Sequence, residues 1–216
     1  MFEGWLSSVR SQLGALLNMD GKLFMHYTIP GHTVPEHAIR ELEEDVAQHE
    51  GCPAHIPDDL RSFGQHVNSV SFFWERLDRY ASHAWGKATL PHLFAIYAPY
   101  LPDDGEDTDR DSIVFDRIDE RSWVSITIDL DGQRPGLRYH CAENTGGSPL
   151  DLSLPQYLHT LCALRGLYGW QALFTHGEHA GQGSTRREQI ARQIAALFPD
   201  TDITRLLRQS EGRTDV

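Results

Sequence analysis

The segment from Val34 to Trp74 constrains the fold most, because it orders two helices and a strand along the chain. Apolar residues recur at helical spacing until Gly51, a residue that commonly ends a helix in the left-handed conformation. Pro57 then begins a second helix, because proline fits the first helical turn. The β-forming residues Val70 to Trp74 predict a strand directly after it.

Local signals define the two helices. Thr33 and Glu36 have the spacing of a capping box at the start of the first helix. Asp58 and Asp59 fall in the first turn of the second, where the helix dipole stabilises anions; this position explains them better than a catalytic carboxylate pair does. The apolar stripes and the strand predict a shared core that includes Leu42, Leu60, Phe63, Phe73 and Trp74.

The same segment resembles the SUKH superfamily, which consists largely of bacterial immunity proteins with some fungal cell-wall regulators. The residues that carry the resemblance are Glu41, Leu42, Gly51, Ile56, Pro57, Asp58, Leu60, Arg61, Phe63, Asn68, Phe73 and Trp74. One turn departs from the pattern, because the family often has Asn-Gly where this chain has Asn68-Ser69. The resemblance implies strands and a closing helix as far as Phe174.

The whole chain predicts an α+β fold, with a mainly antiparallel central sheet flanked by helices and with helical extensions at both ends. The expected domains are an N-terminal helix and short strand at 1–32, a SUKH-like domain at 33–175, and a linker with C-terminal helices at 176–216. Further strands are expected at 23–29, 113–118, 123–130 and 137–141, and helices at 1–17, 185–198 and 202–209. Residues 75–87 are expected to form an irregular helix, 144–149 a loop, and 176–183 a flexible linker.

Composition excludes several classes of protein. The net charge of −12 argues against direct binding of nucleic acid, whose phosphates would be repelled. No run of apolar residues is long enough for a membrane span, and the first ten residues lack the pattern of a secretory signal. Three scattered cysteines suggest reduced thiols, and we therefore expect a cytoplasmic protein.

Two histidines are the most plausible metal ligands. His176 and His179 are three residues apart with Glu178 between them, but the stretch is Gly-rich and lacks a third ligand at zinc spacing. Cys52 with His55 would be half of a zinc site, and no second pair follows it. We therefore expect neither a metal nor another cofactor.

No nucleophile stands out in the sequence. Cys141 and Cys162 have no supporting motif, and a thiol on the apolar side of a helix is usually a core residue. The chain also lacks the Gly-x-Ser-x-Gly elbow, the phosphate-binding loop and the dinucleotide fingerprint. These observations favour a binding protein over an enzyme.

Acidic residues are concentrated between residues 101 and 131. This stretch holds eleven acids against three arginines, a net charge of −8 out of −12. A solvated loop and a calcium loop are two interpretations, although the EF-hand frame is missing. The third is a docking surface for a basic protein, because clustered charge raises the association rate and selects partners. The expected partner-binding residues are Asp103, Asp104, Glu106, Asp107, Asp109, Asp111, Asp119 and Glu120.

The SUKH resemblance implies an immunity protein that binds and neutralises a cognate toxin. The acidic balance fits a basic toxin, for example a nuclease. Two alternatives remain at this point: a regulatory protein-binding scaffold like the fungal members, and a small metal-dependent hydrolase that uses His176 and His179. The sequence does not identify the apolar anchors of an interface or the oligomeric state.

Overall fold

The computed structural model describes residues 2, 4–17, 22–29, 33–77, 84–101, 113–142, 144–175 and 180–211. The helices in these residues are α1 (Trp5–Leu16), α2 (Glu36–Glu50), α3 (Asp58–His66), α4 (Leu93–Tyr97), α5 (Leu154–Ala163), α6 (Ala180–Leu197) and α7 (Ile203–Glu211), with short 3-10 helices at Ala98–Tyr100 and Trp170–Phe174. The strands are β1 (Lys22–Thr28), β2 (Val70–Leu77), β3 (Ala84–Leu90), β4 (Ile113–Arg117), β5 (Trp123–Thr127), β6 (Gly136–Cys141) and β7 (Asn144–Pro149).

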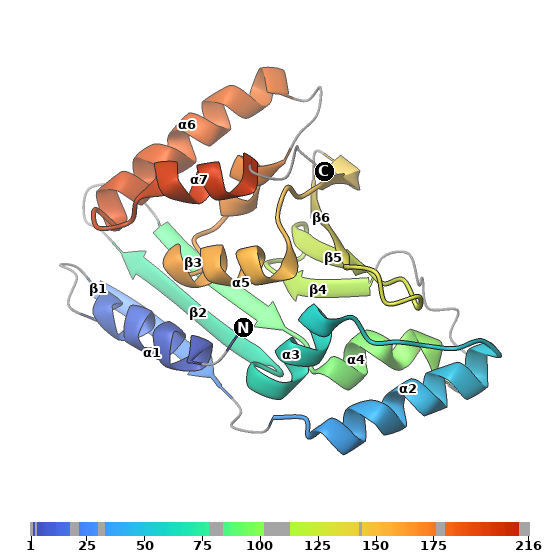
Figure 1. The fold of residues 1–216 in the computed structure, drawn as a ribbon. Coiled ribbons are helices and arrows are strands. Elements are labelled where there is room, and N and C mark those ends of the chain that lie inside the picture. Colours follow the sequence, from blue (N-terminus) through green and yellow to red (C-terminus); the bar gives the residue numbers. More distant parts are fainter. Residues whose placement is uncertain are drawn as a thin grey trace.

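The strands form two antiparallel sheets, ordered β1-β2-β3 and β4-β5-β6-β7. Helices α1 and α5 lie over one face of the three-stranded sheet, and the Trp5 indole N–H donates to the carbonyl of Leu158 (2.9 Å) to join them (Figure 1). Helices α2, α3 and α4 gather at one end of the molecule and α6 and α7 at the other (Figure 1). The protein is therefore an α+β fold with helices flanking antiparallel sheets, as the sequence predicts. The domain boundaries at residues 32 and 175 stay predictions.

Four of the five predicted core residues are buried, and the fifth is not. Leu42, Leu60, Phe63 and Trp74 are at most 1% exposed. Phe73 is half-buried, because it follows the alternation of β2 and points to the face opposite Trp74. The Trp74 indole N–H donates to the carbonyl of Arg165 (2.6 Å), which fixes Trp74 on the face toward α1 and α5. The prediction for Phe73 is wrong, and the correction matters for the functional surface.

Ion pairs join α2 to α3. The predicted capping box is absent: Pro35 is the N-cap of α2, and no side chain caps the helix. The Glu36 carboxylate instead accepts from Arg61 (2.7 Å) and from the Gln65 amide (2.9 Å). Arg61 also donates to Glu43, which accepts from the backbone N–H between the two helices. Arg61, one of the residues of the SUKH-like motif, thus holds the helix pair together.

The turn between α3 and β2 uses two residues with positive φ. Asn68 has φ 41° and Ser69 has φ 84°. Asn68 tolerates this region, and its side-chain oxygen accepts from the N–H of Leu93 (3.1 Å) at the start of α4. Ser69 occupies the place where glycine is least strained, so the departure from Asn-Gly leaves a strained residue in the turn.

Three predicted segments differ in the structure. Residues 75–77 and 84–87 are strand rather than helix, because β2 continues to Leu77 and β3 begins at Ala84, while 78–83 lie outside the described residues. Residues 144–149 form β7 rather than a loop, since β6 supplies a partner for a Gly-rich segment with few β-formers. Residues 180–183 belong to α6 and are not a flexible linker, while 176–179 lie outside the described residues.

Asp116 connects the two sheets and α5. It is fully buried, beside a register shift in β4, and its two carboxylate oxygens accept from the N–H of Thr89 (2.8 Å) and the hydroxyl of Tyr157 (2.7 Å). Burial raises the pKa of Asp116 to about 6, and these hydrogen bonds partly offset the rise. One acid of the acidic stretch is therefore a core residue.

Candidate protein-binding surface

Four aromatic rings cross the outer face of the three-stranded sheet. Opposite residues of an antiparallel pair share a face, so the pairing of Phe24 with Glu75, and of Glu75 with Trp85, places these side chains on the same side as Phe73. The ring centroids of Phe24 and Phe73 are 6.1 Å apart, those of Phe73 and Trp85 are 6.3 Å apart, and Tyr168 stacks on Trp85 at 4.2 Å. We call these four residues the aromatic row. Phe24 is 60% exposed and the other three are half-buried.

Two shallow hollows adjoin the aromatic row. The first, of about 500 Å³, is lined by Phe73, Glu75, Trp85, Lys87, Ile118 and Asp119. The second, of about 390 Å³, is lined by Asp119, Glu120, Arg121, Ser122, Ala142, Tyr168 and Arg186. Asp119 lies between the two hollows, so the row and the turn after β4 form one continuous surface. Partly exposed aromatic side chains around hollows are typical of protein-binding surfaces.

The structure describes two of the eight predicted partner-binding acids. Asp119 and Glu120 lie in the turn between β4 and β5, where the Asp119 carboxylate accepts from the N–H of Arg121 (2.7 Å). This bond shapes the turn, so part of the role of Asp119 is local. Glu120 is exposed beside it. The other six predicted residues lie outside the described residues: Asp103, Asp104, Glu106, Asp107, Asp109 and Asp111.

Charge at the two hollows is balanced. Three carboxylates face three cations among the lining residues: Glu75, Asp119 and Glu120 against Lys87, Arg121 and Arg186. The described part of this surface therefore supplies apolar contact area and paired charges. Residues 103–111, which precede β4, contribute −5 of the net charge of −8 in the acidic stretch.

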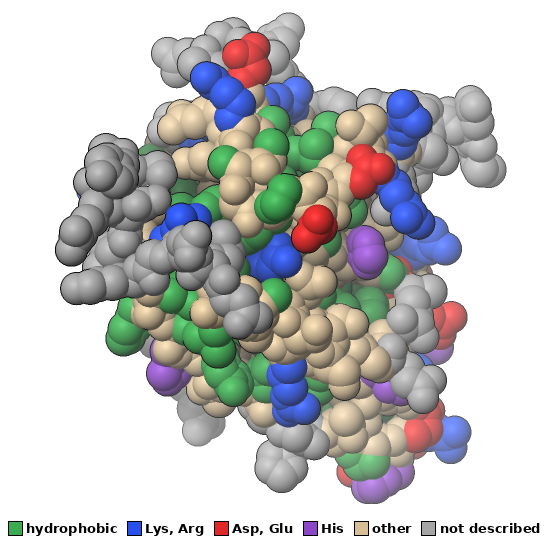
Figure 2. Space-filling model, turned by 90° about the vertical axis from the view of Figure 1, so that its left-hand side faces the viewer, with side chains coloured by type: hydrophobic (Ala, Val, Ile, Leu, Met, Phe, Trp, Pro, Cys, Tyr) green, Lys and Arg blue, Asp and Glu red, His purple; other side chains and the backbone are tan. Residues whose placement is uncertain are grey.

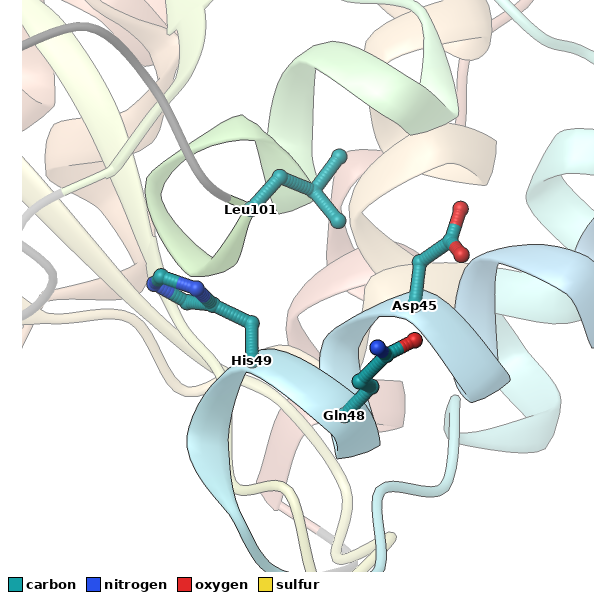
Figure 3. A pocket seen from close by; sticks show the side chains of 4 residues that line it. All are labelled: Asp45, Gln48, His49 and Leu101. Carbon is teal, nitrogen blue, oxygen red and sulfur yellow. The ribbon is translucent and has the colours of Figure 1, made fainter.

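A separate hollow lies at Leu101, the last described residue before the acidic residues 103–111. It measures about 570 Å³ and is lined by Asp45, Gln48 and His49 of α2 and by Leu101. Figure 3 shows the three α2 side chains and Leu101 pointing toward the space between their segments. The exposed acids Glu41, Glu44 and Asp45 follow the solvent side of α2. Exposed acids on α2 thus lie close to Leu101, the last described residue before the acidic stretch.

A buried Ser–His pair, which the sequence did not reveal, combines two residue types that occur together in catalytic sites. Ser125 Oγ lies 2.8 Å from His140 Nε2, and Trp123 stacks on the His140 ring at 4.8 Å. A serine beside a histidine is the pairing that nucleophilic catalysis uses. Ser125 is 0% exposed, however, so a substrate does not reach its hydroxyl in this structure. The pair joins β5 to β6 as a satisfied core contact.

The thiols and histidines within the described ranges form no assembled site. Cys162 is buried, and burial raises its pKa to about 11, so its thiol is protonated at neutral pH; Cys52 is exposed and Cys141 half-buried. His55 lies 3.2 Å from Glu43 rather than in a metal cluster with Cys52. Among the described residues no three His, Cys, Asp or Glu side chains are placed to hold a metal ion. His176 and His179 lie outside the described residues.

None of the helices in the described ranges is long and apolar enough to cross a membrane. Comparisons with protein-family models, with curated proteins and with solved structures found no match to this chain. The resemblance to the SUKH superfamily therefore stays a prediction that rests on the residues of the Val34–Trp74 segment.

Proposed function

We propose that this protein is an immunity protein that neutralises a basic toxin by binding it, with the aromatic row as its apolar anchor. The observation that carries the proposal is the row itself: four contacting rings lie at the surface, bordered by hollows, on the outer face of a sheet. The SUKH resemblance supports an immunity role, and the net charge of −12 supports a basic partner.

The row suits the centre of an interface because aromatic side chains bury a large area at a small entropic cost. Trp85 is held between Phe73 and Tyr168, so its ring is ordered before a partner arrives. Preordered side chains lose less conformational freedom on binding, which leaves more of the contact energy as affinity. Truncating such an anchor typically weakens binding by about 2 kcal/mol or more.

Negative charge acts at an earlier step, the encounter of the two proteins. The acids between Asp103 and Asp111, with Asp119 and Glu120 beside the row, attract a positively charged partner before close contact forms. Exposed charges act through salt-screened fields, so this effect appears in the association rate. The apolar row acts in the complex, so its effect appears in the dissociation rate.

The test uses the product of the gene next to the one that encodes this chain. Binding kinetics and protection of cells from that product are measured for the wild-type chain and for Trp85→Ala. The expected dissociation rate of Trp85→Ala is roughly 30 times faster, which corresponds to about 2 kcal/mol, with weaker protection of the cells. Phe94→Ala is the matched control, because Phe94 is an exposed aromatic residue on α4, outside the row.

A folded Trp85→Ala variant that dissociates at the wild-type rate would remove the aromatic row from the interface. A second variant tests the charges: Asp104→Lys, Asp107→Lys and Asp109→Lys together should slow association and reduce its dependence on salt. Fold stability should hardly change, because charges at a protein surface typically contribute little to it. An unchanged association rate and salt slope would exclude this acidic stretch from the encounter surface.

A further inference from the structure

The strand β1 is the edge of the three-stranded sheet. All seven of its residues pair with β2 in one register, from Lys22 opposite Leu77 to Thr28 opposite Ser71, without a bulge. Within the described residues no strand pairs with the other side of β1. Alternate backbone N–H and C=O groups of such an edge point outward and are available to another strand.

Apart from Lys22 at its start, this edge lacks the features that normally protect an edge strand. Its sequence, KLFMHYT, contains no proline and no acid, and its pairing with β2 shows no bulge that would twist it away. It also exposes apolar side chains on both faces of the sheet, since Phe24 is 60% exposed on the outer face and Tyr27 is 53% exposed on the inner face. Leu17, directly after α1, is 64% exposed. Three of the four large hydrophobic residues that are exposed in the described ranges thus lie in β1 or directly after α1, the fourth being Phe94.

The side chains of β1 are arranged symmetrically about Met25. One position away on either side lie Phe24 and His26, both on the outer face, and two positions away lie Leu23 and Tyr27, both on the inner face. If two copies of β1 pair antiparallel with Met25 at the centre, Phe24 of each copy faces His26 of the other, and Leu23 faces Tyr27. Cross-strand pairs of aromatic and apolar side chains stabilise a sheet, so this register brings suitable partners together at the central positions 23 to 27, with Lys22 opposite Thr28 at the ends.

We propose that a second copy of this chain pairs with β1 in this register and forms a two-fold dimer with a continuous six-stranded sheet. A second copy fits better than a foreign strand because the pattern complements itself about its own centre. Charge is compatible with the same edge: the chain carries −12 overall, but β1 contains no acid, so no two carboxylates of β1 face each other between the copies. Figure 2 views the molecule from the side on which α1 and β1 lie in Figure 1, and shows hydrophobic side chains with few acidic ones.

The dimer would also extend the surface assigned above. A two-fold axis perpendicular to the sheet keeps the outer faces of both copies on the same side. The aromatic rows of the two copies would then meet at Phe24 and form one band across six strands. The dimer does not depend on the proposed function, because it needs only the edge of β1, whereas toxin binding is tested at Trp85.

The test measures molar mass by light scattering or sedimentation over a roughly hundredfold range of concentration. Wild-type protein should shift from monomer to dimer. Phe24→Lys with His26→Lys places like charges opposite each other in the proposed register, so this variant should stay monomeric. Phe24→Glu with His26→Lys places opposite charges there and should restore a dimer that salt weakens. Phe94→Lys, at an exposed aromatic residue on α4, is the control and should dimerise like the wild type.

Each alternative result contradicts the proposal. Wild-type protein that stays monomeric at the highest concentration excludes the dimer. A dimer that persists in the Phe24→Lys, His26→Lys variant shows that the copies meet elsewhere. Loss of the dimer in the Phe24→Glu, His26→Lys variant excludes the register centred on Met25. Hydrogen exchange of the wild-type β1 amides needs no variant: protection must rise with concentration, and constant protection excludes pairing at this edge.

Discussion

Replacing Asp116 with asparagine should change how the stability of this protein depends on pH. The carboxyl group is fully buried, and its charged form is disfavoured mainly because it has lost contact with water. The N–H of Thr89 and the hydroxyl of Tyr157 stabilise the charged form, but only in part. The pKa therefore rises from 3.8 to about 6 on folding.

The direction in which the free energy of unfolding changes with pH follows from proton binding. Between pH 3.8 and about 6 the folded state holds a proton on Asp116 that the unfolded state has lost, so the free energy of unfolding falls as pH rises. The stabilising contribution of the protonated Asp116 is complete below pH 3.8 and is lost above about pH 6. A shift from 3.8 to about 6 corresponds to a loss of about 3 kcal/mol across this window. Asp116→Asn, which does not titrate, lacks this contribution.

The assay is urea denaturation of wild type and Asp116→Asn at a series of pH values from about 4 to about 7.5 at constant ionic strength. The difference in unfolding free energy between the two proteins isolates Asp116, because the other titrating groups are common to both. It should change by about 3 kcal/mol in favour of the variant as pH rises. Parallel stability curves would refute the reasoning and would mean that the carboxyl group ionises normally in the fold.

Tyr157→Phe tests the cause of the shift. The tyrosine hydroxyl donates to Asp116 and lowers the pKa of the carboxyl group, so its removal should raise that pKa further. The upper limit of the pH window should then move to higher pH. A window that stays in place would show that the hydroxyl does not contribute to the ionisation of Asp116.

Two further predictions concern the Val34–Trp74 segment. Phe63→Ala should lower the free energy of unfolding by roughly 3–5 kcal/mol, because Phe63 is 0% exposed and packs edge-on against Phe115 at 5.6 Å; an unchanged denaturation midpoint would contradict its place in the core. Ser69→Gly should raise it by up to about 1 kcal/mol, because glycine adopts φ 84° without strain; a destabilised variant would show that the Ser69 side chain outweighs the backbone strain.

The order α2, Gly51, α3, turn and β2 could be predicted from the sequence because each signal acts within a few residues. Apolar spacing defines the buried side of each helix, and Ile39, Leu42 and Val46 are buried as predicted. Gly51 ends α2 in the left-handed conformation, which glycine adopts at little cost. The proposed binding residues were harder to predict: the structure describes Asp119 and Glu120 in the turn after β4, the other six expected acids lie outside the described residues, and a partner-binding role stays a prediction for all eight.

Tertiary contacts decided which face of each strand is buried. Phe73 and Trp74 are both large and aromatic, so the sequence does not distinguish the buried one from the exposed one. The bond from Trp74 to the carbonyl of Arg165 joins residues 91 positions apart, and this contact turns Trp74 inward and leaves Phe73 in the aromatic row. Local patterns do not encode such a partner.

Long-range contacts also explain why β3 contains a glycine and why Asp116 is buried. At Gly86 a Cβ would clash with the indole of Trp74 and with the carbonyl oxygen of Arg165. Glycine therefore occupies this position because distant segments pack closely there, although glycine weakens the strand pattern in the sequence. Asp116 lies in a stretch rich in acids, and only the partners Thr89 and Tyr157 make it a core residue. Sequence periodicity records the local geometry of one element, whereas burial of a side chain depends on which other elements pack against it.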